Sequence, residues 1–108
     1  MPWSLSKELI CPSCDVVLAR ATYRRIPPLL LLTSPEGDPV VPENVGTQLL
    51  RARQRHDGDA VAFLQRNITE LVVELRCRNG HRTLRTVPQL VRAVRSARGA
   101  WVDLRSSA

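Results

Sequence analysis

The chain has 108 residues, of which 44% are hydrophobic and only 4% aromatic, and it carries a net charge of +6. A chain of this length is expected to form one domain, residues 1–108, with a core of aliphatic side chains. The sequence has neither an apolar run of the roughly 20 residues that a membrane-spanning helix needs nor a secretory signal at its start, so we expect a cytoplasmic protein without membrane attachment.

The first third of the chain predicts short β-strands. Residues 6–10 and 15–20 flank Cys11-Pro12-Ser13-Cys14 and are expected to pair as a hairpin with this loop as its turn. The apolar run 29–33 predicts a buried strand. Turn-forming residues dominate 34–39, which predicts a surface loop.

The middle of the chain, residues 43–67, predicts an inserted helical segment. A first helix is expected over 43–56. The apolar residues expected on its buried side are Val45, Leu49, Leu50 and Ala52. The Asp-Gly-Asp sequence at 57–59 interrupts this helix, and Asp59 is expected to cap a second short helix that runs through Leu64.

The last third predicts a second hairpin and a helix. Residues 70–77 alternate in polarity and predict a strand, and 81–87 returns as its partner after the turn-forming dipeptide Asn79-Gly80. A proline in the first turn predicts a basic helix over 88–98, with Gly99 as a left-handed cap at its end. The fold class is therefore expected to be α+β, with antiparallel hairpins, an inserted helical segment and a C-terminal helix.

Four potential metal ligands fall into two clusters, Cys11 with Cys14 and Cys77 with His81. Thiolates and imidazole are the ligands that Zn²⁺ prefers in closed tetrahedral sites, and two loops that each supply two ligands can build one. All three cysteines of the chain are used, and paired cysteines in the cytosol are more often metal ligands than disulfides. The sequence thus predicts one structural Zn²⁺ per chain. His56 is the only rival fourth ligand, and we expect it to be solvated or to cap a helix end.

Two catalytic interpretations of these residues fail on the sequence. A redox dithiol is activated at a helix N-terminus, but the Cys11–Cys14 loop precedes any strand–helix unit. A zinc deaminase needs a glutamate two residues after its histidine and a proline before its first paired cysteine, where this chain has Thr83 and Ile10. Four protein ligands also leave no open position for water, so we expect the protein not to be an enzyme.

The two strand–loop–strand halves, residues 7–20 and 70–87, resemble the zinc-ribbon superfamily. The first cluster matches a ribbon knuckle, whereas the second has His81 after three intervening residues in place of cysteine after two. The spacer of 62 residues between Cys14 and Cys77 is longer than in a minimal ribbon, which implies that the helical segment is an insertion. The resemblance implies a structural zinc site and a docking role on transcription or translation machinery.

The positive charge is concentrated near the C-terminus. Seven arginines and no acidic residue lie between Arg76 and Val102. Arginine pairs well with phosphate because its planar guanidinium can donate to two oxygens. The residues predicted to bind nucleic acid are Arg78, Arg82, Arg85, Arg92, Arg95 and Arg98, which we expect to form one continuous basic surface.

The expected partner is duplex DNA or structured RNA contacted through its backbone. Binders of single strands stack bases on exposed aromatic side chains, and this chain has few aromatics beyond those its core needs. The alternative function is protein docking, in which the same arginines contact an acidic protein surface. An ordinary solvated helix surface is the third explanation of the arginines.

Overall fold

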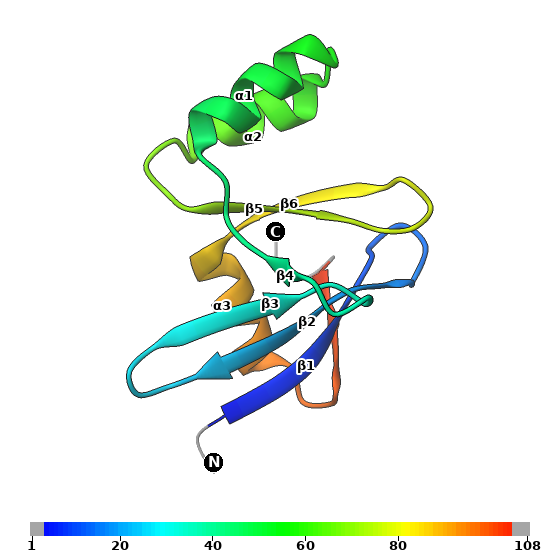
Figure 1. Ribbon diagram of the computed structural model, residues 1–108, viewed down its shortest axis with the longest axis vertical. Coiled ribbons are helices and arrows are strands. Elements are labelled where there is room, and N and C mark those ends of the chain that lie inside the picture. The colour runs from blue at the N-terminus through cyan, green and yellow to red at the C-terminus, as the bar shows by residue number, and fades with distance from the viewer. Residues whose placement is uncertain (1–3, 105–108) are drawn as a thin grey trace.

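The structure is a computed structural model and describes residues 4–104 (Figure 1). It has an α+β fold with three helices and two sheets among these residues. In chain order the elements are β1 (Ser4–Ile10), β2 (Val17–Arg24), β3 (Leu29–Thr33), β4 (Pro39–Val40), α1 (Val45–Gln54), α2 (Gly58–Arg66), β5 (Val72–Arg76), β6 (Arg82–Thr86), α3 (Val87–Ser96) and β7 (Trp101–Asp103).

A five-stranded sheet with the order β4-β3-β2-β1-β7 forms one layer. The predicted hairpin around Cys11–Cys14 is confirmed, because β1 and β2 pair antiparallel on either side of this loop. Strand β7 was not predicted from the sequence. It pairs in parallel with the end of β1, where Leu9 lies opposite Val102, and it closes that edge of the sheet.

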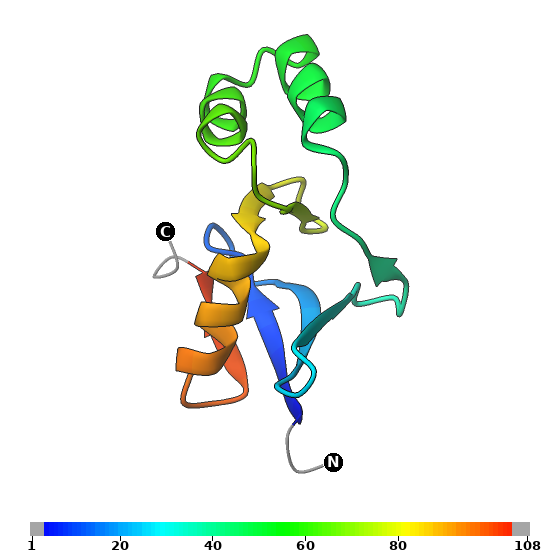
Figure 2. The same ribbon diagram turned by 90° about the vertical axis from the view of Figure 1, so that its left-hand side faces the viewer.

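The second sheet is the predicted hairpin of β5 and β6, and it lies between two cores. Alternate residues of a strand point to opposite faces, and Val73 accordingly packs in the larger core with the five-stranded sheet and α3. Its neighbour Val72 packs in a smaller core with α1 and α2, which we call the helical lobe. Figures 1 and 2 show the helical lobe on one side of this hairpin and α3 descending along the five-stranded sheet on the other.

The helical lobe differs from prediction in two details. Asp57 caps α2 by accepting a hydrogen bond from Ala60 N–H, so the predicted cap at Asp59 is wrong and Asp59 lies in the first turn. Leu50 is 58% exposed, although helical periodicity placed it on the buried side. Gln48 is buried instead, because it faces β5 and donates to the carbonyl of Val72.

Strand β3 exists as predicted but is not buried throughout. Only Leu32 is buried, while Leu29 and Leu31 are exposed. The reason is alternation: Leu30 and Leu32 pack on the core side of the sheet, whereas Leu29 and Leu31 point to its opposite face. The predicted loop 34–39 gives its last residue to β4.

Helix α3 begins one residue before its predicted start and ends two residues before its predicted end. Thr86 caps it in a reciprocal capping box with Gln89, which satisfies two backbone donors. The predicted left-handed cap at Gly99 is wrong, since positive φ angles within residues 4–104 occur only at other positions. The ammonium of Lys7 instead donates to the carbonyls of Ala97 and Gly99, 2.7 Å from each. None of the three helices in residues 4–104 is long or apolar enough to cross a membrane.

Candidate metal centre

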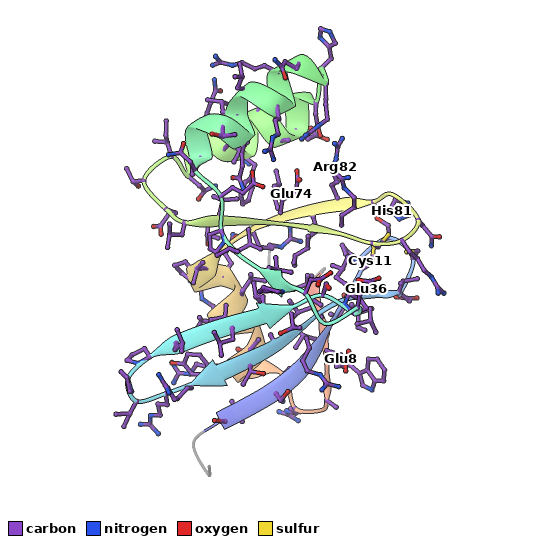
Figure 3. The ribbon with its side chains drawn as sticks, in the orientation of Figure 1. Glu8, Cys11, Glu36, Glu74, His81 and Arg82 are labelled. Carbon is purple, nitrogen blue, oxygen red and sulfur yellow. The ribbon has the colours of Figure 1, made fainter. Side chains whose placement is uncertain are left out.

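The four predicted ligands come together at one point where the two hairpins meet. Cys11 and Cys14 lie in the β1–β2 loop, and Cys77 and His81 lie in the β5–β6 turn. Their ligand atoms all lie within 4.8 Å of one another. Figure 3 shows Cys11 and His81 at the end of the β5–β6 hairpin that adjoins the β1–β2 loop. Residues separated by more than 60 positions thus form a Cys₃His group that could hold a metal ion.

Two of the distances between ligand atoms are close to those around a tetrahedral ion. With bonds of about 2.3 Å to sulfur and about 2.05 Å to nitrogen, a tetrahedron places two sulfurs about 3.8 Å apart and a sulfur and a nitrogen about 3.6 Å apart. The Sγ atoms of Cys14 and Cys77 are 3.6 Å apart. The Sγ of Cys77 lies 3.4 Å from Nδ1 of His81. All three thiols are free, and this spacing is much longer than a disulfide bond of about 2.05 Å.

Backbone hydrogen bonds hold both loops in the required curvature. In the first loop, the N–H of Cys11 donates to Val16 and the N–H of Asp15 donates to Cys11, at 2.8 and 3.1 Å. In the second, the N–H of Cys77 donates to His81 and that of Gly80 donates to Cys77, both at 3.0 Å. Each loop contains one residue with positive φ, Asp15 at 61° and Gly80 at 87°, and this conformation turns the chain back toward its ligands.

The electrostatics favour thiolates at two of the three cysteines. A hydrogen bond from the side chain of Asn79 is the main cause that lowers the pKa of Cys14, to about 6. Burial acts to raise the pKa of Cys77, but hydrogen bonds from the backbone of His81 and Asn79 help bring it below its ordinary value. Burial raises the pKa of Cys11. Since the thiolate is the form that binds metal, the loops prepare Cys14 and Cys77 as ligands.

The site is set into the core on one side. Cys11 and Cys77 are buried, Cys14 is half-buried and His81 is exposed. A metal ion bound here would link the β1–β2 hairpin to the β5–β6 hairpin. The sequence analysis identified all four members of this group and missed Asn79, whose only signal was its place in the turn-forming Asn-Gly dipeptide. His56 lies at the end of α1 and does not belong to the group.

The fold and this site define an α+β protein with a Cys₃His group that could hold a metal ion. Comparisons of the chain with protein-family models, with curated proteins and with solved structures give no match.

Five of the six predicted nucleic-acid-binding arginines fall into two groups along the chain, and the sixth, Arg85, lies on β6 between them. Arg78 and Arg82 lie in or beside the metal-binding turn. The other group, which we call the helix arginines, lies on or just after α3 and consists of Arg92, Arg95 and Arg98.

Three of the seven arginines between Arg76 and Val102 have partners among the described residues. Arg85 is half-buried and donates to the carbonyls of Leu84 and Leu104 at 2.8 and 2.9 Å. Arg82 lies 3.4 Å from Asp57 at the start of α2. Arg76 lies 3.9 Å from Glu74.

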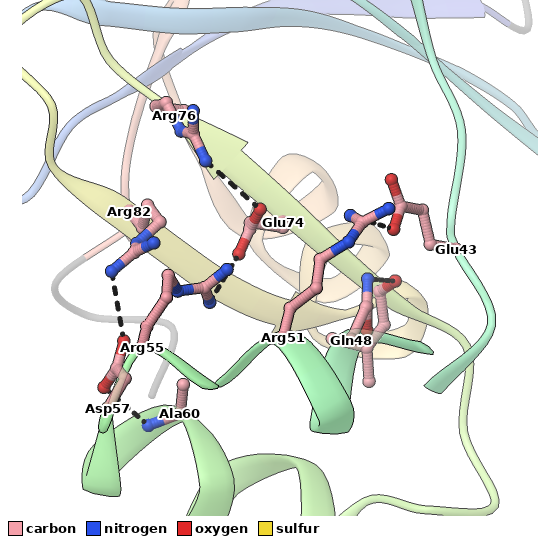
Figure 4. Close-up of polar contacts among 10 residues, drawn as sticks. Glu43, Gln48, Arg51, Arg55, Asp57, Ala60, Glu74, Arg76 and Arg82 are labelled. Carbon is pink, nitrogen blue, oxygen red and sulfur yellow. Dashed lines mark hydrogen bonds and ion pairs between the residues drawn. The ribbon is translucent and has the colours of Figure 1, made fainter. Parts of the chain in front are cut away.

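Figure 4 shows how such ion pairs tie the helical lobe to the β5–β6 hairpin. Glu74 on β5 accepts from Arg55 at the end of α1, at 3.4 Å, and Asp57 meets Arg82 of β6. By contrast, Arg78 and the helix arginines are exposed and form no ion pair with any residue in 4–104. Of the seven arginines between Arg76 and Val102, these four are the ones exposed to solvent without an ion-pair partner in residues 4–104.

Proposed function

We propose that this chain is a zinc-ribbon-like, non-enzymatic protein that holds one structural Zn²⁺ and binds nucleic acid through the helix arginines. Zinc is proposed because three thiolates and one imidazole are a donor set typical of structural zinc, and the four ligand atoms lie within 4.8 Å of one another. Four protein ligands fill the coordination sphere, so the metal would hold the two hairpins together without activating water.

The nucleic-acid proposal rests on one observation: the helix arginines are exposed and form no ion pair with a described residue. Arg92 and Arg95 are three positions apart and therefore lie on one flank of α3. Their opposite flank, with Leu90 and Val94, is fully buried, so α3 is fixed with this flank outward. Exposed guanidinium groups on a rigid helix that form no ion pair with a described residue suit contact with phosphate.

The test is the salt dependence of binding to a short duplex DNA and to an RNA hairpin, measured by fluorescence anisotropy. The double variant Arg92→Ala/Arg95→Ala should weaken binding, and the slope of log K against log salt should fall by about 2. The matched control is Arg53→Ala/Arg66→Ala, which removes the same charge from exposed arginines of the helical lobe. The absence of binding at low salt, or equal weakening by both double variants, would contradict the proposal.

A second candidate function, docking to an acidic protein, has its own support. A shallow depression on α3 is lined by Val87, Pro88 and Val91 beside Arg92 and Arg95. Apolar side chains next to arginines suit an acidic amphipathic segment better than they suit phosphates alone. Nuclease treatment of complexes captured on the purified protein separates the candidates, because a protein partner would be retained after the treatment.

A further inference from the structure

A cleft between the two sheets lies beside the metal-binding group and is not used by the proposed function. It has a volume of about 550 Å³, within the range of ligand pockets. Leu18 and Leu75, both almost fully buried, form part of its floor, and Val17 and Val40 add half-buried apolar surface. The cleft is therefore a concave apolar site bounded by polar walls.

One wall of the cleft is the free edge of β5. Within residues 4–104, β5 pairs with β6 on one side, and its other edge carries a single antiparallel bridge between Val72 and Glu43. The segment that precedes Glu43 turns away from β5, because its residue Val40 pairs with Leu32 of β3. The space between the diverging segments is the cleft.

The register of the hairpin identifies the backbone groups that face this space. The N–H of Cys77 donates to the carbonyl of His81. Hydrogen-bonded pairs alternate along an antiparallel ladder, so residues 75 and 73 are also directed at β6. The N–H and C=O groups of Glu74 and Arg76 are consequently directed away from β6, as those of Val72 are at its bridge. No residue in 4–104 pairs with them.

The charges on the rim differ between the two walls. Arg78 is exposed at the β5 wall and has no ion pair among the described residues. Glu36, on the β3–β4 loop, is exposed at the opposite wall (Figure 3). That part of the opposite wall consists of the loop residues Ser34, Pro35 and Glu36, so β5 is the wall that can pair with an added strand.

We propose that this cleft binds an extended peptide segment of a partner protein, which adds as a strand to the free edge of β5. Main-chain hydrogen bonds to Glu74 and Arg76 would supply affinity, as in other cases of strand addition to an exposed sheet edge. Every second side chain of the peptide would enter the apolar floor. The charge pattern of the rim selects a peptide with an acidic residue toward Arg78 and a basic residue toward Glu36. This inference is independent of nucleic-acid binding.

The test begins with a displayed library of random octapeptides that is selected on the full chain. We expect enrichment of sequences with alternating apolar residues and one charge of each sign. With a selected peptide bound at saturation, amide hydrogen exchange of Glu74 and Arg76 should slow at least tenfold, while exchange in β1 and β2 should not change. If no sequence is enriched, or if a selected peptide leaves these two amides unprotected, the proposal is overturned.

Charge reversal provides the second arm of the test. Arg78→Glu and Glu36→Lys should each weaken binding of the selected peptide at least fivefold, and reversal of the matching charge in the peptide should restore it. Arg53→Glu, on the exposed side of α1 and outside the cleft, is the matched control and should leave the affinity unchanged. Equal effects of Arg53→Glu and Arg78→Glu would show that the peptide responds to net charge alone and would overturn the assignment to this cleft.

Discussion

Replacement of Lys7 by methionine tests how α3 is held against the five-stranded sheet. Lys7 is the only lysine in the chain, and its ammonium donates to the carbonyls of Ala97 and Gly99 at 2.7 Å each. These carbonyls lie where α3 ends and the chain turns into β7. One side chain of β1 therefore fixes both the end of the helix and the start of an edge strand. Methionine keeps an unbranched apolar stem and removes the charge.

The expected loss in the free energy of unfolding follows from the two hydrogen bonds of Lys7 and from how exposed their acceptors are. A hydrogen bond that involves a charged group contributes about 1.5–3 kcal/mol. Ala97 is half-buried and Gly99 is exposed, so water can reach both carbonyls in the variant and the loss falls below the sum of two such bonds. We expect the free energy of unfolding of Lys7→Met to fall by about 2 kcal/mol. For a chain of this size that corresponds to a decrease in Tm of about 8 °C.

Urea and thermal unfolding followed by circular dichroism measure this change. Arg25→Met is the matched control, because it removes the same charge from an exposed turn residue that has no ion pair in the described part of the chain. The control should change the free energy of unfolding by less than about 0.5 kcal/mol. If Lys7→Met is no less stable than Arg25→Met, Lys7 does not hold the end of α3 and the reasoning is refuted.

Three further predictions concern the metal-binding turn and the start of α3. Gly80→Ala and Gly37→Ala each place a side chain at positive φ, and each should lower the free energy of unfolding by about 1–2 kcal/mol. Only Gly80→Ala should lower the affinity for zinc in a chelator competition, because Gly80 lies in the turn between Cys77 and His81. Equal zinc affinities of the two variants would contradict the role of this turn. In metal-free protein, alkylation of Cys14 by iodoacetamide should have its midpoint near the thiol pKa of about 6. Asn79→Ala should move this midpoint to higher pH because the thiolate loses its main hydrogen bond, and an unchanged midpoint would exclude that bond. Thr86→Val should lower the urea-derived free energy of unfolding by about 1 kcal/mol through loss of the cap of α3, whereas Thr86→Ser should retain most of it.

The Cys₃His group was predictable because its signal is local. Cys11 with Cys14 and Cys77 with His81 are each defined by spacing within one short loop, and the chemistry of the ligands then requires the loops to meet. The contribution of Asn79 was not predictable in the same way. Its effect on Cys14 depends on how closely two loops that are far apart in the sequence approach each other. The sequence does not specify the distance between the Asn79 side chain and the sulfur of Cys14.

The fold shows the same limit. Hairpins and helices with clear turn and cap signals were predicted, but β7 was missed because its three residues pair with β1 across more than 90 positions. The cap of α2 is Asp57 instead of Asp59, since either carboxylate has the right chemistry and only the path of the preceding helix decides between them. Leu50 was assigned to the wrong side of α1 because periodicity does not reveal that Gln48, a polar residue, faces β5.

The most direct test of the account is the metal content and coordination of the purified protein. Elemental analysis should find one zinc ion per chain, and zinc K-edge X-ray absorption should find three sulfurs at about 2.3 Å and one nitrogen at about 2.0–2.1 Å. Metal far below one equivalent per chain after purification without chelators, or a coordination sphere with fewer than three sulfurs, would contradict the assignment of Cys11, Cys14, Cys77 and His81 as a closed structural site.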